Sequence, residues 1–433
     1  MHSEDKLLET VFSELGIWED ALDDGLDKKI RQHLLESLSD PAHREKLKMR
    51  IARHEYHVAP PHEAQVPKDD GTMRTVYAND GYDRVLLTVV NNVLFKHCPE
   101  MIHPKCVSYQ SGIGCGKIDR QVVREIAALP DSVKSGRFGY KIDLSKYFDS
   151  VPIEYIDEAF DAIETKFGPS AVLDFVREYY HDDTLIALDK TEIHKYTSLR
   201  QGCAIAAFLA DCVLYDIDEA ISSMPGIVYY RYSDDILIIG ENADEAFSKI
   251  SAMLDAKSLT LNPKKVEPLD SRHWFTFLGF SIRNSELTLS KKRIKNLQKE
   301  IEKRTIRAKN HNIGPKAALH KVYMYLYDDS ITRYGYADGI LPIITSEEDM
   351  RQLDLFILDC VRACATKRRK IGGLGYDKAG ESGVIVRGKG RNVRSNRNDI
   401  PEVEGYVSIR FMKSLYMSDR SAYKAYVKEM LLS

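Results

Sequence analysis

The sequence predicts an α+β protein whose centre is a small antiparallel sheet flanked by helices. Between residues 139 and 280, β-forming apolar runs alternate with amphipathic helical runs in the order strand, helix, strand, strand, helix, strand, which is a split βαβ pattern. The composition, 43% hydrophobic and 29% charged over 433 residues, is that of a globular chain long enough for several subdomains.

The region before this pattern is predicted to be helical, then β, then helical again. Residues 1–56 have the periodicity of amphipathic helices, and one of these helices is expected to begin after Asp40, because Pro41 suits the first turn of a helix. The prolines and the Asp-Gly turn of residues 58–77 predict a hairpin, and a long helix is expected over 81–96. The next loop, SYQSGIGCGK, lacks the Lys-Ser/Thr ending of a phosphate-binding loop, so we interpret it as a flexible connector.

The central pattern has one recognisable stretch for each element. A strand that runs into a turn is predicted for FGYKIDLSKYF, a helix for IEYIDEAFDAIETKF, and a loop entering one long helix for SLRQGCAIAAFLADCVLYDIDEAI. A hairpin is predicted for IVYYRYSDDILIIG, because two apolar β runs flank Ser-Asp-Asp. A helix follows in ENADEAFSKISAMLDAKS, a strand with a loop in LTLNPKKVEPL, and a further strand in WFTFLGFSI.

Positive charge is concentrated in the C-terminal third. Residues 291–321 and 362–397 each hold eleven Lys and Arg, so that the two stretches together carry +18 while the rest of the chain carries −21. Such asymmetry is typical of a polyanion-binding part joined to an acidic remainder, although solvated helical faces would give the same pattern. Residues 371–400, rich in Gly, Lys, Arg and Asn, are expected to be loop-like without a ligand.

Several classes of protein are disfavoured by the composition. There is no run of eighteen apolar residues, so no membrane span is expected, and the acidic N-terminus does not have the pattern of a secretory leader. None of the seven cysteines forms a CxxC pair, which argues against a zinc ribbon, and Cys360 and Cys364 are expected to be two small buried residues of one helix. A reduced, cytoplasmic protein is the expectation.

Three aspartates stand at the ends of predicted buried strands. Asp143 ends the strand of FGYKID, and Asp234 and Asp235 occupy the turn of the later hairpin. Carboxylates held between buried strands are costly unless something offsets their charge, and a divalent cation does so. Taken alone, an Asp-Asp pair in a turn is also common on exposed surfaces.

The neighbouring stretches decide between these readings, because they resemble the motifs of the reverse transcriptase family in order and spacing. VPKDDGTMRTV resembles the fingers hairpin, KIDLSKYFDSV motif A, LRQGCAIAAFLAD motif B, YSDD motif C, LTLNPKKVE motif D and FTFLGF motif E. The resemblance covers residues 56–290 well and the thumb weakly. Within the family, the compact size, DRVL and SYQSGIG are most like bacterial defence-associated and abortive-infection reverse transcriptases.

The resemblance implies a right-hand polymerase fold with fingers, an antiparallel-sheet palm and a helical thumb. The expected division is a helical N-terminal extension (1–55), fingers (56–138), palm with fingers-side insertions (139–283), helical thumb (284–360) and basic C-terminal extension (361–433). It also implies an RNA-directed DNA polymerase that copies a dedicated non-coding RNA in bacterial antiphage defence.

For the metal site, the resemblance implies two Mg²⁺ ions, with Mn²⁺ as a substitute, held by Asp143, Asp234 and Asp235. Asp235 is expected to be either a ligand or a support, and the carbonyl of Ile142 or Leu144 could complete a site. Lys265 is the candidate to protonate the leaving pyrophosphate, although Lys264 is an equal candidate on chemistry alone. Asp149 is interpreted as structural support.

For the deoxynucleotide, the resemblance implies Lys68 and Arg74 at the triphosphate and Gln201 and Gly202 beneath the nucleotide. Phe148, five residues after Asp143, is expected to exclude a 2′-hydroxyl. It could instead be a core aromatic, and Tyr147 would take the role if the register differs by one.

The expected partners are a structured RNA template, a DNA product and dNTPs, with no membrane and an undetermined oligomeric state. The nucleic acid is expected to contact Lys291, Lys292, Arg293, Lys367, Arg368, Arg369 and Lys370. Motif B departs from the family, because Cys203-Ala204-Ile205-Ala206 stands where many members have Ser-Pro.

Other functions remain compatible with these residues. An RNA-dependent RNA polymerase shares the palm chemistry, although Phe148 and the Tyr-X-Asp-Asp form count against it. A catalytically silent RNA-binding scaffold, and template-independent or protein-primed DNA synthesis in abortive infection, are the further alternatives.

Overall fold

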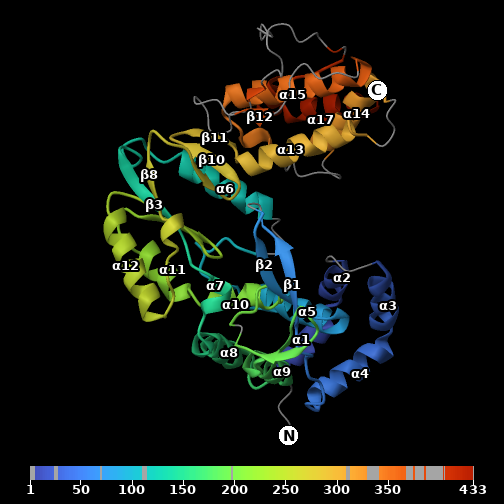
Figure 1. The fold of residues 1–433 in the computed structure, drawn as a ribbon, viewed down its shortest axis with the longest axis vertical. Coiled ribbons are helices and arrows are strands. Elements are labelled where there is room, and N and C mark those ends of the chain that lie inside the picture. The colour runs from blue at the N-terminus through green and yellow to red at the C-terminus, as the bar shows by residue number, and fades with distance from the viewer. Residues whose placement is uncertain are drawn as a thin grey trace. The chain divides into compact units, whose positions relative to one another are not determined.

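The computed structural model describes residues 5–23, 28–68, 71–109, 115–196, 198–308, 313–328, 341–366, 374–375, 385–386, 403 and 405–432. The chain forms two compact units. Unit 1 contains residues 1–112 and 139–268, and unit 2 contains residues 113–138 and 269–433. Both units combine helices with antiparallel strands, as the predicted α+β class requires (Figure 1).

Unit 1 begins with helices, as predicted, and the described residues before 53 form four of them. They are α1 (Lys6–Ser13), α2 (Leu15–Asp23), α3 (Lys28–Ser39) and α4 (Pro41–Ala52). Asp40 caps α4 by accepting a hydrogen bond from the Ala42 amide at 2.9 Å. Asp5 caps α1, and its second oxygen accepts from the Ala171 amide at 2.9 Å, which ties these helices to the start of α9 (Ala171–His181).

The predicted hairpin consists of β1 (His62–Pro67) and β2 (Met73–Ala78), paired antiparallel, and it is followed by α5 (Gly81–His97). The sequence pattern does not predict the second hairpin of this sheet, β4 (Thr184–Ile186) and β5 (Glu192–His194), which gives the strand order β2-β1-β4-β5. The 3₁₀ turn Pro99–Met101 follows α5.

The central sheet has the strand order β6-β7-β3-β8. Its strands are β3 (Arg137–Asp143), β6 (Val228–Tyr232), β7 (Asp235–Ile239) and β8 (Glu267–Asp270). β3 pairs antiparallel with β7 from Gly139↔Ile239 to Asp143↔Asp235, and β6 and β7 form the predicted hairpin. The segment predicted as a strand with a loop forms the 3₁₀ turn Pro263–Lys265 before β8.

Within the described residues of unit 1, five longer helices accompany this sheet, besides the short α7 (Tyr147–Ser150). They are α8 (Ile153–Phe167), α9, α10 (Ala206–Cys212), α11 (Tyr215–Ser222) and α12 (Ala243–Ala256). The prediction of one long helix over α10 and α11 is wrong, because the chain breaks at Val213 and Leu214. At this break the Asp211 carbonyl accepts a hydrogen bond from Arg231 Nη2 at 2.9 Å.

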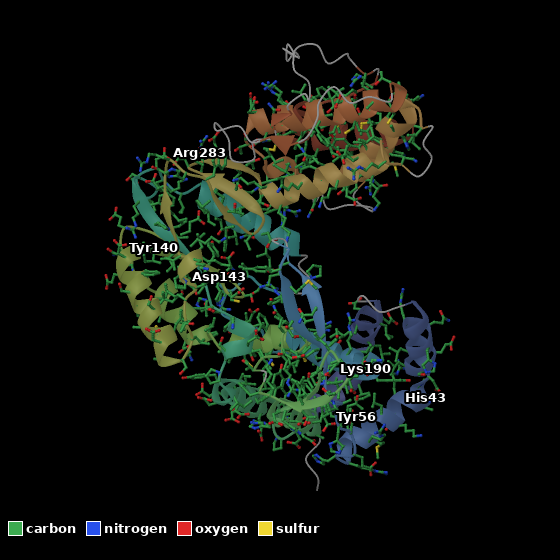
Figure 2. The ribbon with its side chains drawn as sticks, in the orientation of Figure 1. His43, Tyr56, Tyr140, Asp143, Lys190 and Arg283 are labelled. Atoms are coloured by element: carbon green, nitrogen blue, oxygen red, sulfur yellow. The ribbon has the colours of Figure 1, made fainter. Side chains whose placement is uncertain are left out.

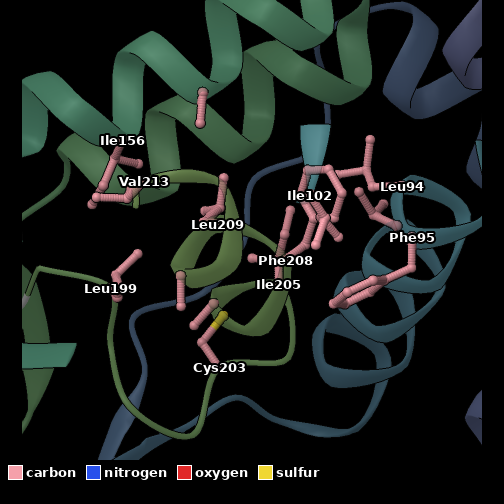
Figure 3. Packing of buried hydrophobic residues seen from close by; sticks show 14 of the residues in the cluster. Leu94, Phe95, Ile102, Ile156, Leu199, Cys203, Ile205, Phe208, Leu209 and Val213 are labelled. Atoms are coloured by element: carbon pink, nitrogen blue, oxygen red, sulfur yellow. The ribbon is translucent and has the colours of Figure 1, made fainter. Parts of the chain in front are cut away.

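Helix α10 lies in the middle of the apolar core of unit 1. Figure 3 shows Phe208 and Leu209 of α10 among side chains from α5 and α8. Phe208 is fully buried and meets Phe95 of α5 edge to face, with ring centroids 5.4 Å apart. Because apolar burial fixes α10, the loop before it and the turn it contacts are held by the same core.

Unit 2 contains a three-stranded sheet and a set of helices. The segment predicted as one strand is two, β9 (Phe275–Phe277) and β10 (Phe280–Arg283), because Leu278 and Gly279 take positive φ values of 50° and 76° and turn the chain. β11 (Glu286–Leu289) pairs with β10.

The helices of unit 2 are α6 (Cys115–Ala127), α13 (Lys291–Arg304), α14 (Pro315–Tyr327), α15 (Glu347–Thr366), α16 (Ile409–Ser418) and α17 (Arg420–Leu432), with a 3₁₀ turn over Leu341–Ile343. Cys360 and Cys364 are both buried in α15, as predicted. Most of residues 371–400, which were expected to be loop-like, lie outside the described residues. The described part of this segment consists of β12 (Leu374–Gly375) and β13 (Ile385–Val386), which pair with each other. Over the described part of the chain, no helix combines the length and the apolar character needed to cross a membrane.

The pairing of β3 with β7 depends on a glycine. A Cβ at Gly139 would lie 2.2 Å from the Ile238 carbonyl oxygen, a contact that only a shift of the backbone can relieve. We therefore expect Gly139→Ala to lower the free energy of unfolding by about 2–3 kcal/mol, measured by chemical denaturation. Gly16→Ala is the control, because nothing lies within 4 Å of its added Cβ, and it should be neutral or slightly stabilising. Equal stability of the two variants would contradict this account of the strand pair.

Candidate active site

The register of the central sheet brings two of the predicted aspartates together. Asp143, the last residue of β3, lies directly opposite Asp235, the first residue of β7. Residues that are directly opposite in an antiparallel pair project from the same face of the sheet. Figure 2 shows Asp143 in this part of unit 1, three residues along β3 from Tyr140.

Asp234 stands beside this pair in the turn. Its carbonyl accepts a hydrogen bond from the Leu144 amide at 3.1 Å, which fixes the turn against the end of β3. Burial raises the pKa of the Asp234 carboxyl, and the charge of Asp143 raises it further, whereas Lys265 and Arg74 oppose the shift. The structure therefore brings all three aspartates into one electrostatically coupled group.

A lysine compensates Asp143. Lys265 Nζ donates to Asp143 Oδ2 at 2.7 Å. The chain before this lysine is held along the strand end, because the Asn262 amide donates to the Asp143 carbonyl at 2.8 Å and the Asn262 side chain accepts from the Lys264 amide. The structure thus brings Lys265, and not the neighbouring Lys264, to the carboxylates.

A second lysine, which sequence reasoning missed, compensates Asp235. Lys141 Nζ lies 3.4 Å from Asp235 Oδ2. Burial raises the pKa of Asp235 to about 6, and Lys141 opposes the shift. Lys141 stands two residues before Asp143 on one strand and therefore projects from the same face, a signal present in the sequence.

This group fits a divalent cation once a lysine withdraws. Among the described residues, no three His, Cys, Asp or Glu side chains are arranged to hold a metal as they stand. In this structure Asp143 and Asp235 are each paired with a lysine. Asp235 Oδ1 is buried without a hydrogen-bond partner, and carboxylate oxygens are the ligands that Mg²⁺ prefers. Asp143 and Asp234 would hold such an ion, with Asp235 beside them.

The hairpin of β1 and β2 places one positively charged side chain near the three aspartates. Arg74 of β2 is near enough for its charge to lower the pKa of Asp234 and of Asp149, although burial raises the pKa of both carboxyls. Lys68, at the tip of the hairpin, has no contact with the three aspartates within the described residues, and its amide donates to the Thr72 carbonyl at 2.7 Å.

Gln201 and Gly202 lie against strand β2. The Gln201 carbonyl accepts a hydrogen bond from the Tyr77 amide at 2.7 Å. Gly202 has a φ of +105°, and a Cβ there would come within 3.1 Å of Val76 Cβ and 3.2 Å of the Tyr77 carbonyl oxygen. Glycine is therefore required at this close approach between the β1–β2 hairpin and the segment that enters α10.

The two candidate sugar-contacting aromatics have different environments. Tyr147 is 1% exposed, and its hydroxyl donates to the Ala210 carbonyl at 2.6 Å, so it is a core residue. Phe148 is half-buried and packs edge to face on Tyr147. Its carbonyl accepts from the Leu199 amide at 3.1 Å, which places Phe148 beside the segment that leads to Gln201.

A buried arginine, also missed by sequence reasoning, binds the turn that carries Asp234 and Asp235. Arg231 is fully buried and forms two hydrogen bonds with the Asp218 carboxylate, at 2.7 and 2.6 Å. Its Nη1 also donates to the Ser233 carbonyl at 3.1 Å. Two features of the sequence could have indicated this cluster. One is the charged residue inside the apolar run IVYYRY, and the other is the presence of Asp211 and Asp218 in the apolar helices α10 and α11.

The predicted nucleic-acid contacts lie in unit 2. Lys291 and Lys292 are exposed in the first turn of α13. Arg293 is only partly exposed, because its guanidinium lies over the Phe280 ring and 3.7 Å from Asp119. The predicted basic run 367–370 lies outside the described residues.

The raised pKa of Asp235 predicts a pH-dependent stability. A carboxyl with a pKa near 6 in the fold and near 4 in the unfolded chain destabilises the fold fully above pH 6, progressively less between pH 6 and 4, and not at all below pH 4. Without divalent ions, Asp235→Asn should raise the free energy of unfolding by about 1–2 kcal/mol at pH 8, and the gain should vanish by pH 4. Denaturation curves across this range test it, with the exposed Asp255→Asn as control. A gain that does not vary with pH would contradict the assignment.

The central half of the chain is similar in sequence to known proteins. A model of the family described as reverse transcriptase (RNA-dependent DNA polymerase) matches residues 66–282, which is half of the chain. The retron Ec48 reverse transcriptase of Escherichia coli is 22% identical over 210 residues, which cover 47% of this chain and 47% of that protein. The chain therefore spans about half the length of this curated relative.

Two solved structures of apo telomerase from Candida tropicalis are also similar at 13% identity. The first, truncated from its C-terminal domain, matches 54% of this chain and 56% of telomerase with a TM-score of 0.39. The second matches 72% of this chain and 57% of telomerase with a TM-score of 0.42. The segment matched by the family model contains Asp143, Asp234 and Asp235 together with the β1–β2 hairpin residue Arg74, and the chain belongs to the reverse transcriptase family.

Proposed function

We propose that this chain is an RNA-directed DNA polymerase that joins deoxynucleotides with two divalent metal ions, Mg²⁺ in the cell. The observation that carries the proposal is the juxtaposition of Asp143, Asp234 and Asp235 at one end of the central sheet, with Lys265 and Arg74 close to them. Two bound divalent cations supply an activated primer 3′-oxygen and charge stabilisation at the leaving pyrophosphate.

The chain's own residues have distinct roles in this proposal. Asp143 and Asp234 are the shared ligands, and Asp235 is held beside them by Lys141. The Lys265 side chain is 58% exposed and is free to leave Asp143, after which it can donate a proton to the pyrophosphate. Arg74 and Lys68 neutralise the triphosphate, because guanidinium and ammonium groups suit phosphate oxygens.

The nucleotide would be selected by Phe148 and seated on Gln201 and Gly202. The half-buried ring of Phe148 is fixed by the buried Tyr147 beneath it, so the ring has little freedom to make room for a 2′-hydroxyl. Gly202 permits a close approach of backbone to ligand.

We further propose that the template is a structured non-coding RNA and that the protein serves in bacterial antiphage defence. The resemblance to defence-associated reverse transcriptases supports the role, and the concentration of Lys and Arg in the last third of the chain supports the RNA. Lys291 and Lys292 of α13, the basic run 367–370 and the Lys and Arg residues that follow it within 371–400 are the proposed contacts.

The metal assignment predicts that Asp234→Asn combined with Asp235→Asn abolishes dNTP incorporation and leaves the fold intact. Removing two ionised groups relieves repulsion at the turn but removes the metal ligand Asp234 and the carboxylate beside it, which should cost at least about a thousandfold in rate. Incorporation is measured on a primer–template with dNTPs and rNTPs side by side, and circular dichroism checks the fold. Incorporation at the wild-type rate by the double variant would refute the assignment, and a preference for rNTPs in the wild type would indicate an RNA polymerase instead.

The sugar contact predicts that Phe148→Ala raises the ratio of rNTP to dNTP incorporation while dNTP use falls modestly. The reason is removal of a steric block, so the change should appear mainly in the KM for rNTPs. Tyr147→Phe is the matched control, because it removes only the hydrogen bond to Ala210 and should leave the ratio unchanged. If neither Phe148→Ala nor Tyr147→Ala changes the ratio, the steric gate is wrong.

The RNA proposal predicts that deletion of residues 371–400 abolishes recovery of co-purifying RNA, whereas activity on a supplied generic primer–template largely survives. Lys and Arg that contact phosphates account for most of such binding, which should also weaken steeply with salt. RNA recovery is quantified by sequencing after purification at low and moderate salt. Equal recovery with and without the segment would contradict a dedicated RNA bound there.

A further inference from the structure

The glycine-rich loop that begins with Ser108 and Tyr109 contacts the turn that carries the aspartates. Ser108 is fully buried, and its Oγ accepts a hydrogen bond from the Ser233 amide at 3.0 Å. The Tyr109 hydroxyl donates to Ser233 Oγ at 3.2 Å. The amide and the hydroxyl of Ser233 are therefore bound by two consecutive residues that are more than a hundred positions away in the sequence. This part of the loop is not the flexible connector that its composition predicts.

Ser233 needs this support because its backbone is strained. Its φ is +57°, in the left-handed region that a residue with a side chain adopts at a cost of about 1–2 kcal/mol. Ser233 is also 3% exposed, so its amide would be buried without a partner if Ser108 lost its oxygen. The conformation of the turn thus depends on the contacts from the loop.

The loop can impose this conformation because it is itself anchored. The Val107 amide donates to the Arg231 carbonyl at 2.8 Å, and the Arg231 amide donates to the Lys105 carbonyl at 2.9 Å. The Ser108 hydroxyl donates to Asp211 Oδ1 at 2.6 Å. One serine oxygen therefore joins the loop, helix α10 and the turn.

We propose that Ser108 and Tyr109 are positioning residues for nucleotidyl transfer: they hold Ser233 in its left-handed conformation and so set the directions in which Asp234 and Asp235 project. Asp234 directly follows Ser233 in the chain. A change in the backbone conformation of Ser233 would therefore turn the Asp234 carboxylate away from Asp143. The inference deepens the proposed function and rests on it. It assigns to loop 105–109 an effect on metal affinity and turnover, and not on nucleotide binding.

The test uses Ser108→Ala and Tyr109→Phe in the full-length protein. Each variant removes one hydroxyl, and each has a matched control distant from the turn. Ser170→Ala removes a buried serine hydroxyl that caps α9, and Tyr56→Phe removes a hydroxyl bound to Asp83 (Figure 2 labels Tyr56). Ser108→Thr keeps the hydroxyl and should rescue.

Three quantities are measured for each protein: the Kd for Mn²⁺ without nucleic acid, from electron paramagnetic resonance; kcat and KM for dTTP on a primer–template; and the melting temperature. We expect Ser108→Ala and Tyr109→Phe to raise the Kd for Mn²⁺ several-fold and to lower kcat by about tenfold or more, with KM within about twofold. The two controls should match them in melting temperature and leave the Kd and kcat unchanged.

The outcome that overturns the inference is a loss of melting temperature in both loop variants with Mn²⁺ affinity and kcat equal to those of the controls. If Ser108→Ala does not fold, Tyr109→Phe alone decides, because it leaves the Ser233 amide bonded to Ser108. Failure of the proposed function is distinguishable, since the wild-type protein would then neither bind Mn²⁺ at this site nor incorporate dTTP.

Discussion

Arg231 is a fully buried charge, and the arrangement of the site depends on how that charge is offset. An unpaired guanidinium at 0% exposure would greatly destabilise the fold. Removing one partner of a buried ion pair lowers the free energy of unfolding by about 3–5 kcal/mol. The offset comes from the Asp218 carboxylate, the carbonyls of Asp211 and Ser233, and the Asp211 carboxylate at 3.6 Å. Burial raises the pKa of Asp211 to about 6, against the opposing effect of Arg231. Helices α10 and α11 and the β6–β7 turn therefore share one arrangement that surrounds the Arg231 guanidinium with acceptors, although Asp211 Oδ2 is buried without a hydrogen-bond partner of its own.

The carboxylates of the site are also paired with positive charges. Three carboxylates close together repel one another, and two lysines of different exposure reduce that repulsion. Lys141 projects from a paired strand with a side chain 22% exposed, whereas Lys265 follows a short 3₁₀ turn and is 58% exposed. A fixed counter-ion and a movable one would leave Asp143 available to a cation while Asp235 stays in place.

The parts of this arrangement that follow from local periodicity could be predicted from the sequence. The hairpins around Asp-Gly and Ser-Asp-Asp, the helix after Asp40-Pro41 and the positions of Asp143, Asp234 and Asp235 at strand ends are of this kind. The break between α10 and α11, the turn at Leu278 and Gly279, and the contacts of Ser108, Lys141 and Arg231 are not. These features depend on partners distant in the sequence, and a glycine-rich composition cannot distinguish a connector from a loop that is held by buried hydrogen bonds.

The central claim is that Asp143 and Asp234, oriented by the Ser233 turn, hold the catalytic metals. Its most direct test is a crystal structure of the protein with a primer–template, a non-hydrolysable dNTP and Mn²⁺, with the ions located by anomalous scattering. The account predicts Mn²⁺ bound by Asp143 and Asp234, Lys265 withdrawn from Asp143, and Ser233 still in the left-handed conformation with its amide on Ser108 Oγ. Mn²⁺ bound elsewhere, or a turn that abandons this conformation when the metals are present, would contradict it.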